Sequence, residues 1–188
     1  MSSSIRWPSC FGSFAASDAG RYMELELKPI SREAIPGALE RVERYRLLGE
    51  PWQAESICED ILRIDARNQD ALRGLLLALT DQFGETVQTA RALEAAAQLE
   101  SEYDRAYYEG IVHERAGQAH MRRGIQESAY KAYEYFRRAM DLFERAEQVR
   151  QSGNDDALLR WNTCARMLMR HRELRPRPKE VLEPVMGE

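Results

Sequence analysis

The 188-residue sequence lacks a long hydrophobic run and contains few cysteines, glycines and prolines. A membrane-spanning helix needs about 20 consecutive apolar residues, and because no segment approaches that length we expect no membrane partner. Cys10, Cys58 and Cys164 are too few and too scattered for a disulfide framework, which favours free thiols and a cytoplasmic location. Eleven glycines and seven prolines exclude collagen-like and Pro/Gly-rich low-complexity chains.

Lysine is also scarce, with 3 residues against 24 arginines. A GC-rich genome would explain this bias, and so would anion recognition by guanidinium groups. The net charge of -4 excludes a general binder of polyanions. Apolar residues make up 44% and charged residues 31% of the chain, which predicts a folded core with a well-solvated surface.

No motif in the sequence predicts catalysis. The phosphate-binding patterns GxxxxGK[ST] and GxGxxG are absent, and so is the GxSxG elbow. His113 and His120 are seven residues apart, which places them about 10 Å apart along a helix. That separation is too large for one metal ion with Zn–N bonds of about 2 Å. We therefore expect no enzyme activity, no cofactor and no bound metal.

The two ends of the chain differ in composition from its middle. Residues 1–22 are rich in Ser, Ala and Gly, are nearly free of acidic residues and lack the apolar core of a secretory signal. Met23 opens an ordinary sequence, so residues 1–30 are expected to be a disordered tail or the product of a start upstream of Met23. Residues 175–188 begin with Arg-Pro-Arg-Pro, which predicts an extended C-terminal tail.

Residues 31–174 show helical periodicity almost without interruption, and no window alternates with the period of a strand. The sequence therefore predicts an all-α fold. Start signals predict seven helices, which begin near Ser31, Pro51, Asn68 or Asp70, Thr86, residue 102, residue 126 and residue 155. Ser101 with Asp104 is a variant of the capping box, and Gly49 and Gly84 are expected to end helices.

The glycines at 49, 84 and 117 recur at intervals of 35 and 33 residues, close to a known helix–turn–helix repeat period of about 34. In the clearest unit, residues 35–68, the matching positions are Tyr45, Gly49, Ala54, Cys58, Ile61 and the closing LRIDARN. On these residues the chain resembles the tetratricopeptide-repeat (TPR) family over roughly residues 31–150. Ala66 departs from the usual proline, and a longer fifth helix is expected through His120 to Arg123. Helical hairpins of another solenoid family are the alternative.

The resemblance implies an α-solenoid of about three antiparallel helix pairs with a C-terminal capping helix. It also implies a non-catalytic scaffold or adaptor that binds a peptide or partner segment in a concave groove. The groove positions projected from the family are Leu39, Glu43, Arg46, Arg73, Leu77, Thr80, Tyr107, Ile111 and Arg115. Its three arginines are suited to holding a carboxylate. Self-association through the terminal helices is a further alternative.

An aromatic-rich stretch runs from Tyr103 to Phe136. We expect most of these rings to pack between helices. Helical spacing places Tyr133 and Phe136 in the core, and it places Tyr107 on another face as a candidate for the surface.

A basic segment follows at residues 160–179, with seven cations against one acid, Glu173. Its arginines are Arg160, Arg166, Arg170, Arg172, Arg175 and Arg177. One interpretation is a basic helix end followed by a solvated tail. The alternative is a docking strip for an acidic partner or a nucleic acid, which is the second candidate function of the chain.

Overall fold

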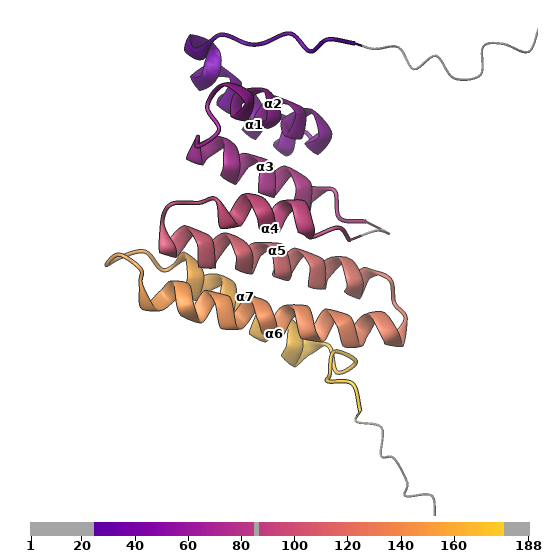
Figure 1. The fold of residues 1–188 in the computed structure, drawn as a ribbon. Coiled ribbons are helices and arrows are strands. Elements are labelled where there is room, and N and C mark those ends of the chain that lie inside the picture. Colours follow the sequence, from indigo (N-terminus) through magenta and orange to yellow (C-terminus); the bar gives the residue numbers. More distant parts are fainter. Residues whose placement is uncertain (1–24, 85–86, 179–188) are drawn as a thin grey trace, which may run out of the picture.

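The computed structural model describes residues 25–84 and 87–178, and these residues form helices without any strand (Figure 1). The predicted all-α fold is therefore confirmed. A short 3-10 turn, Arg32–Ala34, leads into the first helix. The helices are α1 (Ile35–Leu47), α2 (Pro51–Ile64), α3 (Gln69–Asp81), α4 (Ala90–Ala97), α5 (Glu102–Arg122), α6 (Gln126–Gln148) and α7 (Asp156–Arg170).

Each helix packs against the next in chain order, and Figure 1 shows them layered from α1 to α6 with α7 lying against α6. Beyond these neighbours, α1 also contacts α3, and α3 also contacts α5. The long helices α5 and α6 span 21 and 23 residues and are joined by only residues 123–125, so they run antiparallel. The odd-numbered helices α1, α3 and α5 thus share one side of the stack.

The helix boundaries follow the local signals of the sequence at several ends. Gly49 adopts a φ of 74° after α1, a conformation that favours glycine. Asn68 caps α3, because its side chain accepts a hydrogen bond of 3.0 Å from the backbone N–H of Ala71. Ser101 caps α5 through the N–H of Asp104 at 3.3 Å. The reciprocal half of the capping box is not formed, because the Asp104 carboxylate pairs with Arg73 instead.

Other boundaries differ from the predictions. Helix α4 begins at Ala90, and Thr86, its predicted start, lies outside the described residues. Val87, which was predicted to lie inside this helix, and Thr89 both precede it. Ser31 provides no side-chain cap. Residues 25–30 and 171–178 contain no helix or strand, while Met23 and the remainder of both predicted tails lie outside the described residues.

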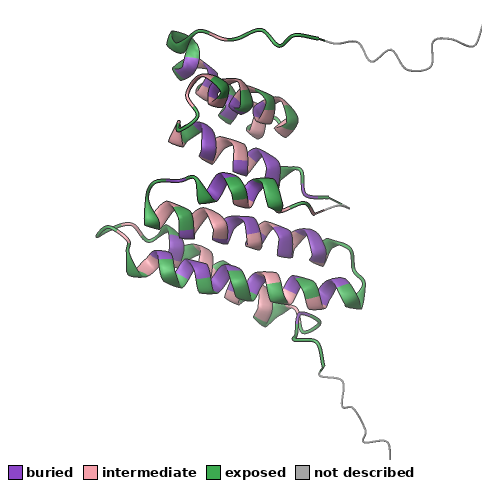
Figure 2. Ribbon diagram, viewed as in Figure 1, coloured by how far each residue is buried: buried purple, intermediate pink, exposed green. Residues whose placement is uncertain are grey.

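The largest core lies between α5 and α6. Phe136 and Phe143 of α6 are both fully buried. They pack against glycines of α5, because a Cβ at Gly110 would lie 2.6 Å from the Phe143 ring. Tyr133 packs partly buried against this core, as its spacing predicts. Figure 2 shows that buried positions recur along every helix, so the stack is held by contacts between neighbours rather than by one central core.

Candidate functional site

A pocket of about 390 Å³ lies on the side shared by the odd-numbered helices. It is bounded by α1, α3 and Tyr108 of α5. Five of the projected groove residues line this pocket: Leu39, Glu43 and Arg46 from α1, and Arg73 and Leu77 from α3. We call it the α1–α3 pocket.

The other projected groove residues lie elsewhere. Thr80 and Ile111 are 3% and 2% exposed, so they offer almost no surface to a partner. Tyr107 is half-buried, and its ring stacks on Tyr103 with centroids 5.5 Å apart. It also meets Phe143 at 5.9 Å, so this tyrosine takes part in aromatic packing.

The projected arginines already have acidic partners within the chain. Arg46 of α1 pairs with Asp81 at 2.7 Å, and Arg115 of α5 pairs with the other oxygen of the same carboxylate at 2.5 Å. Arg115 also donates to the Thr80 hydroxyl at 2.6 Å and to the Leu77 carbonyl at 3.1 Å. Asp81 therefore ties α1 and α5 to the end of α3.

Arg73 makes a second connection between α3 and α5. It pairs with Asp104 at 2.8 Å and with Asp70 of its own helix at 2.5 Å. Each guanidinium therefore already has an internal carboxylate as a partner, and the arginines serve as ties between helices.

The acids that pair these arginines were not identified from the sequence. The ion pair from Arg46 spans 35 residues, and that from Arg115 spans 34. These separations equal the glycine spacing within one residue. Both pairs bring residues of α1, α3 and α5 together at this separation, so a search for opposite charges at that spacing would have found Asp81.

The charges left without partners at the α1–α3 pocket are acidic. Glu40 and Glu43 line it, both are exposed, and neither forms an ion pair with any other described residue. Leu39 and Leu77 are partly buried and supply apolar surface beside them. The pocket therefore presents apolar side chains next to two carboxylates.

Some arginines of the basic segment pair with acids of the chain, and others are exposed. Arg160 lies 3.0 Å from Glu114 of α5, a carboxylate only 2% exposed. Burial raises the pKa of Glu114, and Arg160 opposes that shift. Arg177 pairs with Glu127 and lies 5.7 Å from the centre of the Tyr130 ring. The members that are exposed and have no ion pair with the described residues are Arg166, Arg170, Arg172 and Arg175, while Arg177 is exposed but paired.

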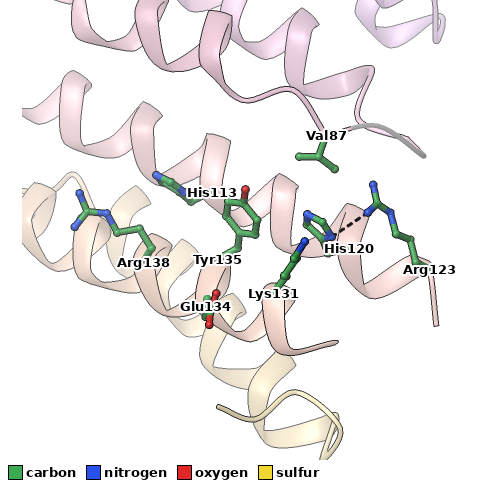
Figure 3. A pocket seen from close by; sticks show the side chains of 8 residues that line it. All are labelled: Val87, His113, His120, Arg123, Lys131, Glu134, Tyr135 and Arg138. Carbon is green, nitrogen blue, oxygen red and sulfur yellow. Dashed lines mark hydrogen bonds between the residues drawn. The ribbon is translucent and has the colours of Figure 1, made fainter. Parts of the chain in front are cut away.

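The two histidines of α5 lie on either side of a ring from α6, in a pocket of about 610 Å³ between the two helices (Figure 3). The Tyr135 centroid is 5.7 Å from that of His113 and 5.3 Å from that of His120. Burial lowers the pKa of both histidines, so both rings are neutral at pH 7. Nδ1 of His113 is buried and makes no hydrogen bond with the described residues. Within residues 25–84 and 87–178, no group of three or more His, Cys, Asp and Glu side chains is placed to hold a metal ion.

Cys58 and Cys164 are buried free thiols. Burial raises the pKa of each to about 12, so neither is a nucleophile at neutral pH. Cys10 lies outside the described residues.

Comparison with protein-family models, curated proteins and solved structures gives no match for this chain. None of the helices within residues 25–84 and 87–178 combines the length and hydropathy required to cross a membrane.

Proposed function

We propose that this protein is a non-catalytic scaffold or adaptor that binds a segment of a partner protein in the α1–α3 pocket. One observation carries the proposal: the pocket combines apolar surface with two carboxylates, Glu40 and Glu43, that form no ion pair with any other described residue, while its arginines are paired with internal acids. The apolar side chains of such a surface provide contact area for a partner, and its carboxylates select partners of opposite charge.

The helix arrangement supports a TPR-like solenoid as the framework for this function. The pairs α1–α2, α3–α4 and α5–α6 follow one another, and α1, α3 and α5 share one side. In stacked helical repeats the first helices of successive pairs line the binding surface. Helix α7 would act as the cap, since it packs on α6. The buried free thiols of Cys58 and Cys164 are compatible with a cytoplasmic setting.

The charge of the pocket favours a partner segment with apolar and basic side chains. A partner carboxylate would meet Glu40 and Glu43 and would compete with Asp81 for Arg46. A lysine or arginine would instead find two carboxylates without partners, and an adjacent apolar side chain would cover Leu39 and Leu77. This charge preference is the reverse of the carboxylate binding for which the three projected arginines are suited.

Selection from a displayed library of random peptides against the full chain tests the proposal. We expect enriched peptides to combine apolar residues with Lys or Arg. Their binding should fall at least tenfold for the double variant Glu40→Arg/Glu43→Arg. The matched control Glu94→Arg/Asp141→Arg makes the same charge change at exposed positions outside the pocket and should bind normally.

Two results would overturn the proposal. Enriched peptides that are acidic would show that the charge assignment is wrong. Peptides that bind the pocket variant as well as the control variant would show that they dock elsewhere. If neither result is obtained, affinity capture with the same variants would identify the natural partner that binds the α1–α3 pocket.

A further inference from the structure

The C-terminal end of α7 presents an apolar side chain between two cations. Met169 is 73% exposed, and Arg166 and Arg170 beside it are also exposed. Residues three or four positions apart are neighbours on a helix surface, so these three side chains lie within about one turn. Cys164 lies on the opposite side of α7, where it is buried in the core that α7 shares with α6. We call the group of Arg166, Met169 and Arg170 the α7 surface.

The two arginines of the α7 surface lack acidic partners within the described part of the chain. Neither Arg166 nor Arg170 forms an ion pair with any other described residue. Residues 157–172 contain no Asp or Glu, so α7 supplies no acid of its own beyond its first residue. Like charges four residues apart on a helix repel each other. Two carboxylates placed against this surface would relieve that repulsion.

The α1–α3 pocket has the same arrangement with the opposite charge. Glu40 and Glu43 are exposed and lie three residues apart on α1, with the apolar side chain of Leu39 beside them. The spacing of the charges agrees as well, because three residues of helix rise about 4.5 Å and four residues rise about 6 Å. Arg41 and Arg44 of α1 do not line the pocket, so they leave its acidic character unchanged.

The two complementary surfaces lie far apart in one molecule. Figure 1 shows α1 at one end of the stack and α7 against α6 at the other end, with α3, α4 and α5 between them. A single copy therefore cannot bring its own α7 surface to its own pocket. A second copy can supply the missing half of the contact.

We propose that the α7 surface of a second copy is a partner segment of the α1–α3 pocket, a step that rests on the proposed function of that pocket. The arginines of the α7 surface pair with the two pocket carboxylates. Met169 covers Leu39 and Leu77, since its flexible side chain adapts to an irregular apolar surface. Each copy carries both halves of the contact, so association increases with protein concentration.

Sedimentation equilibrium of the full chain tests this inference. We expect an average mass above that of a single chain, rising with protein concentration and falling with added salt. The variant Glu40→Arg/Glu43→Arg should weaken association at least about tenfold, because it places like charges at the contact. Arg166→Glu/Arg170→Glu should weaken it by the same factor for the same reason.

Matched controls separate the contact from net charge. Glu94→Arg/Asp141→Arg and Arg137→Glu/Arg145→Glu make the same two charge changes at exposed positions outside both surfaces. Both control variants should associate like the unmodified chain.

An equimolar mixture of the two contact variants gives the sharpest test. Glu40→Arg/Glu43→Arg has a basic pocket, and Arg166→Glu/Arg170→Glu has an acidic α7 surface, so opposite charges meet only in the mixture. We expect the mixture to associate at least about tenfold more strongly than either variant alone.

Two results would overturn this inference: a full chain that stays monomeric up to about 1 mM, or a mixture that associates no better than its components. Library peptides that bind the pocket of such a monomeric chain would leave the proposed function in place. A pocket that binds a second copy and selects no peptide would instead remove the adaptor function and keep the self-association.

Discussion

Glu114 is a buried carboxylate that pairs with one cation, Arg160, and also accepts a hydrogen bond from Gln118 at 3.2 Å. Its side chain is 2% exposed and its carboxylate pairs with Arg160. Removing one member of a buried ion pair leaves a charge without compensation, which costs about 3–5 kcal/mol. The lower end of that range applies here, because the Arg160 side chain is 35% exposed and solvent screens it.

We therefore expect Arg160→Met to lower the free energy of unfolding by about 3 kcal/mol. Urea denaturation measures this loss. Arg166→Met is the matched control, because Arg166 lies exposed on the same helix without an ion pair to the described residues. Adding Glu114→Gln to the Arg160→Met chain should recover at least half of the loss. Equal stability of the two Arg→Met variants would contradict the role of this pair.

His113 carries a second prediction at the scale of one residue. Its Nδ1 atom is buried without a hydrogen bond to the described residues, and such a group costs about 1–3 kcal/mol. His113→Phe removes the polar atom and keeps a flat ring, so we expect the free energy of unfolding at pH 7.5 to rise by about 1 kcal/mol.

The burial of His113 also predicts how the free energy of unfolding depends on pH. The folded-state pKa of His113 is lowered from 6.5, so the unfolded chain takes up the proton first. The stability that the neutral ring contributes is present above pH 6.5 and is lost as the pH falls toward the lowered value. His113→Phe should therefore lose less stability between pH 7.5 and pH 5.5 than the unmodified chain. A steeper loss in the variant would show that burial does not control this histidine.

At the scale of the elements, the α5–α6 hairpin depends on small residues at its crossing. A Cβ at Gly110 would lie 2.6 Å from the Phe143 ring. Alanine favours a helix over glycine by about 1 kcal/mol, but overpacking a core costs about 1–3 kcal/mol. Because the ring is fully buried and has little room to move, we expect the clash to exceed the gain in helix propensity.

Gly110→Ala should therefore lower the free energy of unfolding by about 1–2 kcal/mol, as measured by urea denaturation. Gly84→Ala is the control, because a Cβ there meets nothing within 4 Å and its φ is not positive. It should leave stability within about 0.5 kcal/mol of the unmodified chain. A more stable Gly110→Ala chain would mean that Phe143 can shift at no cost.

The sequence predicts most elements because their boundaries carry local signals. The side chains of Asn68 and Ser101 cap α3 and α5, and Gly49 follows the end of α1 with a positive φ. The predicted start of α4 near Thr86 was wrong, because residues 87–89 are not helical and α4 begins at Ala90. The start of α4 has no capping side chain to fix it. It depends instead on the packing of the alanine-rich face of α4 against α3 and α5, and the local sequence carries no information about that packing.

At the scale of the whole molecule, the odd-numbered helices are joined by a row of ion pairs. Arg46 and Asp81 join α1 to α3, Arg73 joins α3 to α5, and Arg160 joins α7 to α5. The sequence analysis assigned Arg46 and Arg73 to a groove from the family resemblance, and it assigned Arg160 to a basic strip from the local charge. Their partners lie on other helices, and only the Arg46–Asp81 and Arg115–Asp81 pairs have a separation close to the glycine spacing, so the Arg73–Asp104 and Arg160–Glu114 pairs became visible only with the tertiary structure.

The same arrangement leads us to expect weak nucleic-acid binding. Arg160 and Arg177 are already paired with Glu114 and Glu127, and the whole chain is acidic. Fluorescence anisotropy with a 20-nucleotide single strand should give no binding at about 150 mM salt. Tight, salt-sensitive binding that is lost in the variant Arg166→Gln/Arg170→Gln/Arg172→Gln would instead support the basic segment as the functional surface.

The most direct test of the proposed binding surface is nuclear magnetic resonance with labelled leucine methyl groups. A peptide from the library selection is titrated into the full chain, and the methyl shifts of Leu39 and Leu77 are followed with those of Leu93 and Leu159. We predict shifts that saturate at Leu39 and Leu77, which line the α1–α3 pocket, with no change at Leu93 of α4 or Leu159 of α7. Shifts confined to Leu93 or Leu159 would contradict the proposal, because the partner would then dock away from the odd-numbered face of α1 and α3.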